Sequence, residues 1–539
     1  MTRSWYLSKT DLSADYGGEY KEGMVGFPRY INPILAQTND VDRDISRIIF
    51  SGLLKYNYEG KLEPDLAEKY SISPDGKTYT FSLKRNIKWH DGKNLTADDV
   101  IWTIQAIQNP DYKSPLRMSW RGIEMEKIDD FTFSFKIGNV YVPFLGNLTF
   151  GILPKHLWEK ISSVNFPLAE YNLKPIGSGP YKFKEIQKDK AGTIKSLKLE
   201  SWSDYYFKEP YIETIIFKFF KDEDSAIGAY NSKEVDGLNF ISAVNVSKLK
   251  NNFNLNKFIF PRYFAVFFNQ TQSKVLSDKN IRQALTYGVN KDEIIEKALS
   301  GQAQIVNLPL PEIIFKYNHP LNLKTYNFNL EEAAKILDEA KWLMTEKNGI
   351  NLREKTIDNQ NLALEFSLMT VETPELIQIA NLLKSNWEKI GVKINLEIKS
   401  TAEIQENIRS RQYQALLFGE VLGLNPDPFA FWHSSQKKDP GLNLSLYDSK
   451  EVDKLLEEIR QELNEEIRNQ KYEQFQRLIL EDLPAIFLYS PVYLCPVSKN
   501  IKGIIDDLYP DTKFKIISIP SERFSQIENW YIETKRVWK

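Results

Sequence analysis

Histidine is the side chain most often used as a metal ligand or proton carrier near neutral pH, and this sequence contains only four. No two of them are three or four residues apart, the spacing that places two imidazoles on one face of a helix. They are His90, His156, His319 and His433. We therefore predict no metal site. His90 is followed by Asp91, and such neighbours form a local hydrogen bond in a turn more often than a catalytic pair.

The glycine-rich segment 177–180 (GSGP) is the second feature with chemical potential. It has neither the lysine of a phosphate-binding loop nor the spacing of a dinucleotide-binding fingerprint, and it does not match the Gly-x-Ser-x-Gly pattern of a nucleophilic serine. Two interpretations stay open: a backbone that a ligand can approach closely, or a tight turn into a strand that begins at Tyr181.

Acidic and aromatic residues are numerous but carry no catalytic pattern. With 72 Asp and Glu residues, some pair could always be assigned as the acid and nucleophile of a glycoside hydrolase. We predict that the protein is not an enzyme and uses no cofactor, with a carboxylate-based glycoside hydrolase as the alternative from another class. The 11 Trp, 27 Tyr and 31 Phe residues suit a large pocket or interface, although most are expected to fill cores.

The bulk composition indicates a large globular protein. A chain of 539 residues exceeds what one hydrophobic core usually supports, so two or three lobes are expected. The 70 basic and 72 acidic residues nearly cancel, which argues against a nucleic-acid surface. The single cysteine, Cys495, excludes an internal disulfide, and its apolar neighbours predict a buried, unreactive thiol.

Residues 1–17 are polar and aperiodic and are predicted to be a tail or linker. They contain no apolar signal-peptide segment, and no stretch of the chain reaches the roughly 18 apolar residues of a membrane-spanning helix. The residues alone fit either a cytoplasmic protein or one whose leader has been removed.

The elements that must position these residues change character along the chain. In the first half, short segments alternate apolar and polar side chains, as half-buried strands do; Tyr79, Phe81 and Leu83 are an example. Thr96 and Asp99 have the spacing of a capping box, which predicts the start of a helix.

From about residue 275 helical periodicity dominates. Two helix starts are predicted where an Asn is followed three residues later by a Glu, at Asn290 and Asn329. A further helix opening at Pro374 ends before Gly391, and the alternating segment 392–398 then predicts a strand. The architecture indicated is mixed α/β in at least two lobes.

Several segments also follow one another in a specific order. The most specific are 73–81 (SPDGKTYTF), 89–92 (WHDG) and 95–100 (LTADDV). Others are 50–54 (FSGLL), 175–181 (PIGSGPY), 268–270 (FNQ), 281–285 (IRQAL), 425–428 (NPDP) and 484–489 (PAIFLY). Together they resemble the bacterial extracellular solute-binding proteins of family 5, the peptide- and nickel-binding proteins of ABC importers, from about Gly18 to the C-terminus.

The resemblance implies an α/β, two-lobed periplasmic-binding-protein-like fold of type II, in its large peptide-binding class, with an extra inserted subdomain. Lobe I would be discontinuous, the inserted subdomain would span 60–168, and lobe II would span 266–484. Crossing segments near 262–266 and 485–488 would form the hinge. The pieces of lobe I would be 18–59, 169–265 and 485–539.

The resemblance also implies an extracytoplasmic substrate-binding protein of an ABC importer, with the leader or anchor absent from this chain. Such a protein captures an oligopeptide-like solute by hinge closure, because a ligand that contacts both lobes favours the closed state, and delivers it to permease subunits. We expect a monomer that binds no nucleic acid. A non-peptide solute, either an oligosaccharide or a metal chelate, is the alternative within the family.

The residues that the resemblance implicates in substrate binding are mostly small or polar. They are Asn39, Asp40, Ser178, Gly179, Asn269, Glu420, Asn425, Asp427, Trp432 and Asn443. Each also has a structural interpretation. Asn39 could cap a helix, Asp427 could order its Pro-flanked turn, and Trp432 could lie in a core.

One position departs from the family pattern. Members that grip a free amino terminus have an Asp a few residues before the Pro-Asp-Pro-like turn, and Leu424 takes that place here. The nearest upstream acid is Glu420. Because a buried ammonium without a carboxylate is costly, either Glu420 substitutes or the natural ligand lacks that amine.

Overall fold

The computed structural model describes residues 9–250, 252–312, 315, 323–347, 349–357, 360–504 and 515–538, so His319 lies outside the described residues. The chain divides into two compact units. Unit 1 comprises Met1–Phe260 and Tyr493–Lys539, and unit 2 comprises Pro261–Val492.

The unit boundaries differ from the predicted lobe boundaries at both crossings. Residues 261–265 and 485–492 were assigned to lobe I but belong to unit 2. The reason is that β14 (Arg262–Phe268) and β22 (Ala485–Pro491) pair with each other in the main sheet of unit 2.

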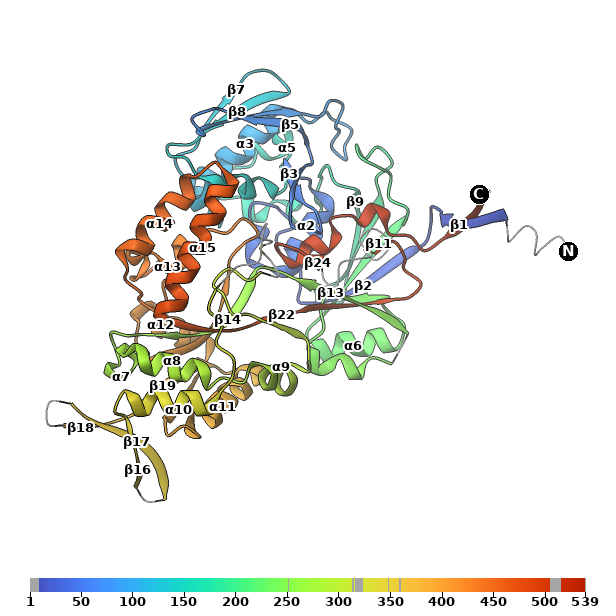
Figure 1. Cartoon of the computed structure of the whole chain (residues 1–539). Helices are drawn as coiled ribbons and strands as arrows, with labels where there is room; N and C mark the ends of the chain where they lie inside the picture. Colours follow the sequence, from blue (N-terminus) through green and yellow to red (C-terminus); the bar gives the residue numbers. More distant parts are fainter. Residues whose placement is uncertain are drawn as a thin grey trace. The chain divides into compact units, whose positions relative to one another are not determined.

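The main sheet of unit 1 has the strand order β24-β13-β23-β12-β2-β11-β10-β9 (Figure 1). Strand β2 lies inside the sheet and pairs in parallel with both β11 and β12. Strands β13 and β23 pair with each other in antiparallel orientation. The strands are β2 (Glu19–Val25), β9 (Tyr181–Lys188), β10 (Ile194–Ser201), β11 (Thr214–Phe220), β12 (Gly237–Leu238), β13 (Phe253–Ile259), β23 (Tyr493–Ser498) and β24 (Lys515–Ile516).

Residues 60–168, the expected inserted subdomain, contain an antiparallel sheet of order β5-β6-β8-β7. Tyr79, Phe81 and Leu83 are buried on β6, as their alternation predicted. The capping box of Thr96 and Asp99 is present. The strands are β5 (Ala67–Ile72), β6 (Thr78–Leu83), β7 (Glu124–Lys127) and β8 (Thr132–Lys136), with helices α3 (Ala97–Gln108), α4 (Arg117–Trp120) and α5 (Lys155–Trp158).

Two helices and two pairs of short strands are further elements of unit 1. Helix α2 (Asp40–Ile49) precedes the hairpin of β3 (Leu54–Tyr56) and β4 (Leu62–Pro64), and α6 (Glu223–Asn231) follows β11. The two ends of the described chain also pair, β1 (Thr10–Ala14) with β25 (Thr534–Trp538) (Figure 1). The predicted tail 1–17 therefore contains a strand, whose partner at the opposite end of the chain leaves no local sequence signal.

Unit 2 is built on a sheet of order β15-β22-β14-β21-β19-β20. Both faces of this sheet are buried: Val266 and Phe268 of β14 belong to one core cluster, and Ala265 and Phe267 to another. Figure 1 shows α8, α10 and α11 on one side of the sheet and α14 and α15 on the other. The remaining strands are β15 (Ala303–Ile305), β19 (Glu365–Val371), β20 (Lys393–Lys399) and β21 (Ala415–Val421).

Helices α9, α10 and α11 of unit 2 begin where the sequence predicted them. Asn290 caps α9 by accepting from the Glu293 N–H, and Asn329 caps α10 by accepting from the Glu332 N–H. The helices are α7 (Lys274–Ser277), α8 (Lys279–Tyr287), α9 (Lys291–Leu299), α10 (Leu330–Glu339), α11 (Pro374–Glu388), α12 (Thr401–Ser410), α13 (Phe429–Trp432), α14 (Lys450–Gln461) and α15 (Glu465–Asp482). A small antiparallel sheet adds β16 (Leu343–Lys347), β17 (Ile350–Ile357) and β18 (Gln360–Ala363).

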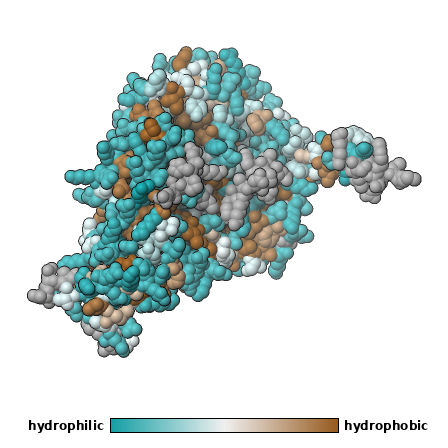
Figure 2. Space-filling model, in the orientation of Figure 1, coloured by the Kyte–Doolittle hydropathy of each residue, from teal (hydrophilic) through white to brown (hydrophobic). Residues whose placement is uncertain are grey.

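The surface seen in Figure 2 is mostly polar, and the single cysteine is buried as predicted. On the face shown in Figure 2, hydrophilic residues predominate and apolar residues form separate small patches. In the described part of the chain, no helix combines the length and apolarity needed to cross a bilayer. Cys495 is buried, its thiol lies 3.0 Å from the Asn239 carbonyl oxygen, and burial raises the pKa of the thiol, which keeps it protonated.

Candidate functional site

The segment 177–179, which we call the 177–179 turn, packs against the C-terminal end of α2. The Gly179 N–H donates to the Ile49 carbonyl oxygen at 2.8 Å. A Cβ atom built on Gly177 would lie 1.9 Å from that same oxygen, and one on Gly179 would lie 2.3 Å from the Ile48 oxygen. Close backbone packing within unit 1 therefore accounts for both glycines.

His90 holds the 177–179 turn from the other side. Its Nδ1 accepts from the Gly177 N–H at 3.2 Å, so its Nε2 carries the proton and donates to the Gly179 carbonyl oxygen at 3.0 Å. Burial lowers the pKa of His90 to about 4, and the ring is neutral at physiological pH. The prediction of a local hydrogen bond between His90 and Asp91 was wrong. Asp91 instead pairs with His156, whose Nε2 lies 2.7 Å from the Asp91 Oδ2.

The predicted polar residues of unit 1 differ in how their side chains are used. Asn39 caps α2, accepting from Val41 and Asp42, and its Nδ2 donates to the Phe27 oxygen at 3.0 Å. Asp40 is exposed and pairs with Arg43. Ser178 is 1% exposed, and within the described residues its Oγ has no hydrogen-bond partner.

Two buried asparagines of unit 2 hold loops together. Asn269 accepts from the backbone and side chain of Thr271 and donates to the Arg411 oxygen at 3.1 Å. Asn443 accepts from the Tyr447 N–H and donates to the oxygens of His433 and Tyr447. Both side chains are fully buried, so these hydrogen bonds fix the backbone around them.

The turn after β21 and the short helix α13 that follows it contain three more predicted residues. Asp427 forms a bidentate pair with Arg460 of α14, the shortest N–O distance being 2.7 Å. This pair orders the turn, in which Asn425 is half-buried. Trp432 is 1% exposed and packs against Phe487 in the core.

Glu420 on β21 stands apart because its carboxyl group is buried and only partly engaged. The residue is 5% exposed and faces Tyr263 across the β14–β21 pairing. The Tyr263 hydroxyl donates to Oε2 at 2.5 Å, while Oε1 has no partner among the described residues. Burial raises the pKa of the Tyr263 hydroxyl, and the indole N–H of Trp432, which also acts on this hydroxyl, lowers it by a smaller amount.

Burial raises the pKa of Glu420 to about 8, and the Tyr263 hydrogen bond opposes this only in part. The carboxyl group is therefore mainly protonated at neutral pH. A neutral acid with one unused oxygen can donate or accept a hydrogen bond, or lose its proton when a cation arrives. The acid itself was predicted, but its partner Tyr263 was missed, because the two residues meet only through strand pairing.

Metal chemistry finds no support in the described ranges. Across residues 9–250, 252–312, 315, 323–347, 349–357, 360–504 and 515–538, no group of three or more His, Cys, Asp or Glu side chains is placed to hold a metal ion.

Each of the two units carries its own sheet and core, and several predicted residues are buried hydrogen-bonding groups. The model of the bacterial extracellular solute-binding proteins, family 5 Middle, matches residues 61–442. The chain therefore belongs to this family, whose members are solute-binding proteins.

Similar proteins agree over nearly the full length. The chain is 28% identical to the oligopeptide-binding protein AppA of Bacillus subtilis over 497 residues, which covers 90% of this chain and 89% of the relative. The solved structure of AppA with a nonapeptide has a TM-score of 0.71 at 27% identity and covers 97% of this chain and 100% of that one. NikZ of Campylobacter jejuni in complex with Ni(L-His) has a TM-score of 0.72 at 27% identity, covering 95% and 99%. The predicted two-lobed α/β binding-protein fold is confirmed.

Proposed function

We propose that this protein captures an oligopeptide-like solute outside the cytoplasm and delivers it to the permease of an ABC importer. The observation that carries the proposal is the likeness to AppA in sequence and fold, since AppA is an oligopeptide-binding protein solved with a nonapeptide. The protein acts without catalysis, as a monomer, and its partners are the solute and the permease subunits.

Capture works by closure of two lobes. The chain leaves unit 1 after Phe260 and returns to it at Tyr493, and short extended strands, β14 and β22, begin or end next to these crossings. A solute that gains contacts in the closed state shifts the population toward that state by its difference in affinity. The permease then recognises the loaded, closed form.

Glu420 is the acceptor for the solute's free amino group. Its Oε1 has no described partner, and its protonated state avoids a buried charge in the empty protein. An arriving ammonium displaces the proton and forms an ion pair, which is strong where water is excluded. Glu420 thereby takes the role left open by Leu424.

The test is calorimetric titration with a peptide and with the same peptide N-acetylated. We expect acetylation to weaken binding at least tenfold, and binding of the free peptide at pH 7 to release a proton, measured as a dependence of the heat on the ionisation enthalpy of the buffer. Glu420→Gln should abolish proton release and remove most of the penalty for acetylation.

The outcomes separate two parts of the proposal. Equal affinity for both peptides would overturn the role of Glu420 but leave peptide capture standing. Failure of every peptide to bind, while mass spectrometry of the purified protein finds a sugar, would overturn peptide capture itself.

A metal chelate is the second candidate, favoured by the likeness to NikZ with Ni(L-His). Because the described residues hold no metal-binding cluster, the chelator would supply most of the metal's ligands. Titration with nickel, L-histidine and their mixture decides the matter: only the mixture should bind if the solute is a chelate.

A further inference from the structure

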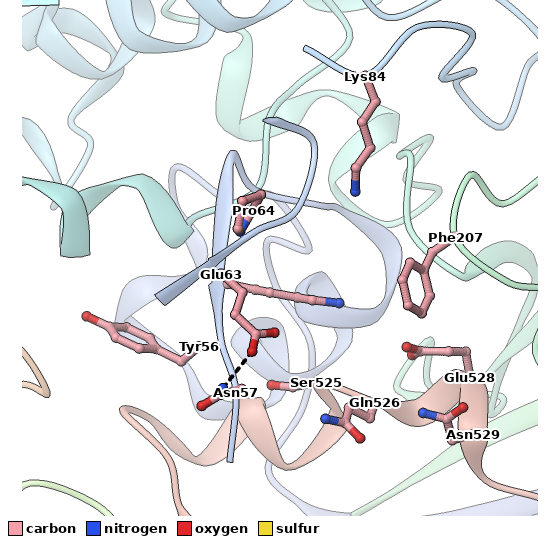
Figure 3. A pocket seen from close by; sticks show the side chains of 11 residues that line it. Tyr56, Asn57, Glu63, Pro64, Lys84, Phe207, Ser525, Gln526, Glu528 and Asn529 are labelled. Atoms are coloured by element: carbon pink, nitrogen blue, oxygen red, sulfur yellow. Dashed lines mark hydrogen bonds between the residues drawn. The ribbon is translucent and has the colours of Figure 1, made fainter. Parts of the chain in front are cut away.

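Unit 1 contains a cavity of about 350 Å³ that the residues predicted from the sequence do not line (Figure 3). Its walls come from the β3–β4 hairpin, the end of β6, the loop after β10 and the segment that precedes β25. The lining residues are Lys55, Tyr56, Asn57, Glu63, Pro64, Lys84, Phe207, Ser525, Gln526, Glu528 and Asn529. A cavity of this size accommodates a small organic molecule.

Two lysines, Lys55 and Lys84, line this cavity together with the acids Glu63 and Glu528. Lys55 Nζ lies 4.9 Å from the centre of the Phe207 ring, and Lys84 Nζ donates to the backbone oxygen of Asp65 at 2.6 Å. Neither lysine forms an ion pair in the described part of the chain. The Asp65 carboxylate already accepts from the Tyr206 hydroxyl at 2.6 Å.

The two ammonium groups also repel each other. Burial lowers the pKa of Lys84, and the charge of Lys55 lowers it further, although Asp65 partly opposes this. Two like charges at a partly buried site are relieved most directly by an anion placed between them. Two lysines without a described ion pair on the wall of one cavity favour a ligand that carries a carboxylate.

Opposite charge is available at the other end of the cavity. Glu528 is 3% exposed, and within the described residues its carboxyl group neither pairs with a cation nor accepts a hydrogen bond from another residue. Burial raises its pKa, while Lys55 opposes the change. Figure 3 shows the side chains of Lys84, Phe207 and Glu528 reaching toward the same open space.

Phe207 supplies an apolar wall. The residue is 60% exposed, so much of its apolar surface is in contact with water. A ligand with an apolar side chain would cover this ring and remove it from water, while its charged end met the lysines.

We propose that this cavity is a second binding site, for a free amino acid with an aromatic or large apolar side chain. The ligand's α-carboxylate lies between Lys55 and Lys84, its α-ammonium pairs with Glu528, and its side chain packs on Phe207. The site is independent of the peptide-capture proposal, because all its lining residues belong to unit 1 and none was assigned to that function.

The test uses L-phenylalanine as the probe, measured by calorimetry on the full chain. We expect Lys55→Met to weaken binding at least tenfold, because the carboxylate loses one of its two cations. Lys69→Met, an exposed lysine on β5, is the matched control and should leave affinity unchanged. Thermal unfolding of each variant confirms that it is folded.

Two analogues of L-phenylalanine test separately the recognition of the ammonium and of the carboxylate. N-acetyl-L-phenylalanine lacks the ammonium and should bind more weakly than L-phenylalanine to the wild-type protein, but equally to the Glu528→Gln variant. L-phenylalaninamide lacks the carboxylate and should lose affinity in wild type but little in Lys55→Met. Absence of L-phenylalanine binding to the wild type at millimolar concentration, or binding that Lys55→Met leaves intact, would overturn the proposal.

Discussion

His90 in unit 1 and Glu420 in unit 2 are both titratable groups that burial keeps neutral at pH 7. They differ in whether every hydrogen-bonding atom of the side chain has a partner. Burial lowers the pKa of His90 to about 4 and raises that of Glu420 to about 8, because in both cases it disfavours the charged form. His90 uses both ring nitrogens on the 177–179 turn. Glu420 leaves Oε1 without a described partner.

The comparison shows that a shifted pKa alone does not indicate a functional group. A buried side chain whose hydrogen-bonding atoms are all satisfied holds structure, as His90 does. A buried side chain with an unsatisfied polar atom lowers stability, and a ligand that forms the missing hydrogen bond recovers that free energy. Substitutions at the two sites should therefore differ in kind as well as in size.

The largest expected effect is the removal of pH-dependent stability at Glu420. Since the folded pKa of about 8 lies above the ordinary value of 4.5, the folded state binds more protons between these pH values. The contribution of this group is thus fully present below about pH 4.5 and is lost as pH rises to about 8, by roughly 5 kcal/mol in total.

Glu420→Gln should flatten this loss when thermal unfolding is followed from pH 5 to pH 9. The difference between variant and wild type is the quantity to plot, because His90 contributes with the opposite sign below pH 6.5. A difference curve without slope would show that the Glu420 carboxyl is ionised in the folded protein.

Gly177→Ala tests the packing of the 177–179 turn that His90 holds. Its Cβ would lie 1.9 Å from the Ile49 carbonyl oxygen, so the backbone of the 177–179 turn must move and the His90 hydrogen bonds must distort. We expect a loss of about 3 kcal/mol in the free energy of unfolding. Gly138→Ala is the control, since a Cβ there meets nothing within 4 Å. Equal stability of the two variants would contradict the packing argument.

His90→Ala should have the smallest effect of the three. It leaves the Gly177 N–H and the Gly179 oxygen without their partner and costs about 2 kcal/mol at pH 7. It should also remove the rise in stability between about pH 4 and pH 6.5, because a neutral buried histidine favours the folded state only above its depressed pKa. His156→Ala, a partly exposed ring paired with Asp91, is the control and should change stability little.

Local sequence patterns predicted much of the fold but little of the site. Periodicity placed β6, and caps placed α9 and α10, because these signals depend on residues a few positions apart. Asn39 and Asp427 were open to two interpretations, and the structure shows a helix cap and an ion pair with Arg460. The partner of Asp427 is on another helix, which no local pattern could reveal.

The sequence by itself determined the family, the alternation of elements and the absence of a histidine-based metal motif. The tertiary structure alone decided which polar atoms remain unsatisfied. Tyr263 meets Glu420, and His90 meets the 177–179 turn, through pairing and packing of segments that are distant in the chain. Burial and hydrogen-bond satisfaction depend on every neighbour in space, whereas periodicity and capping depend only on neighbours in sequence.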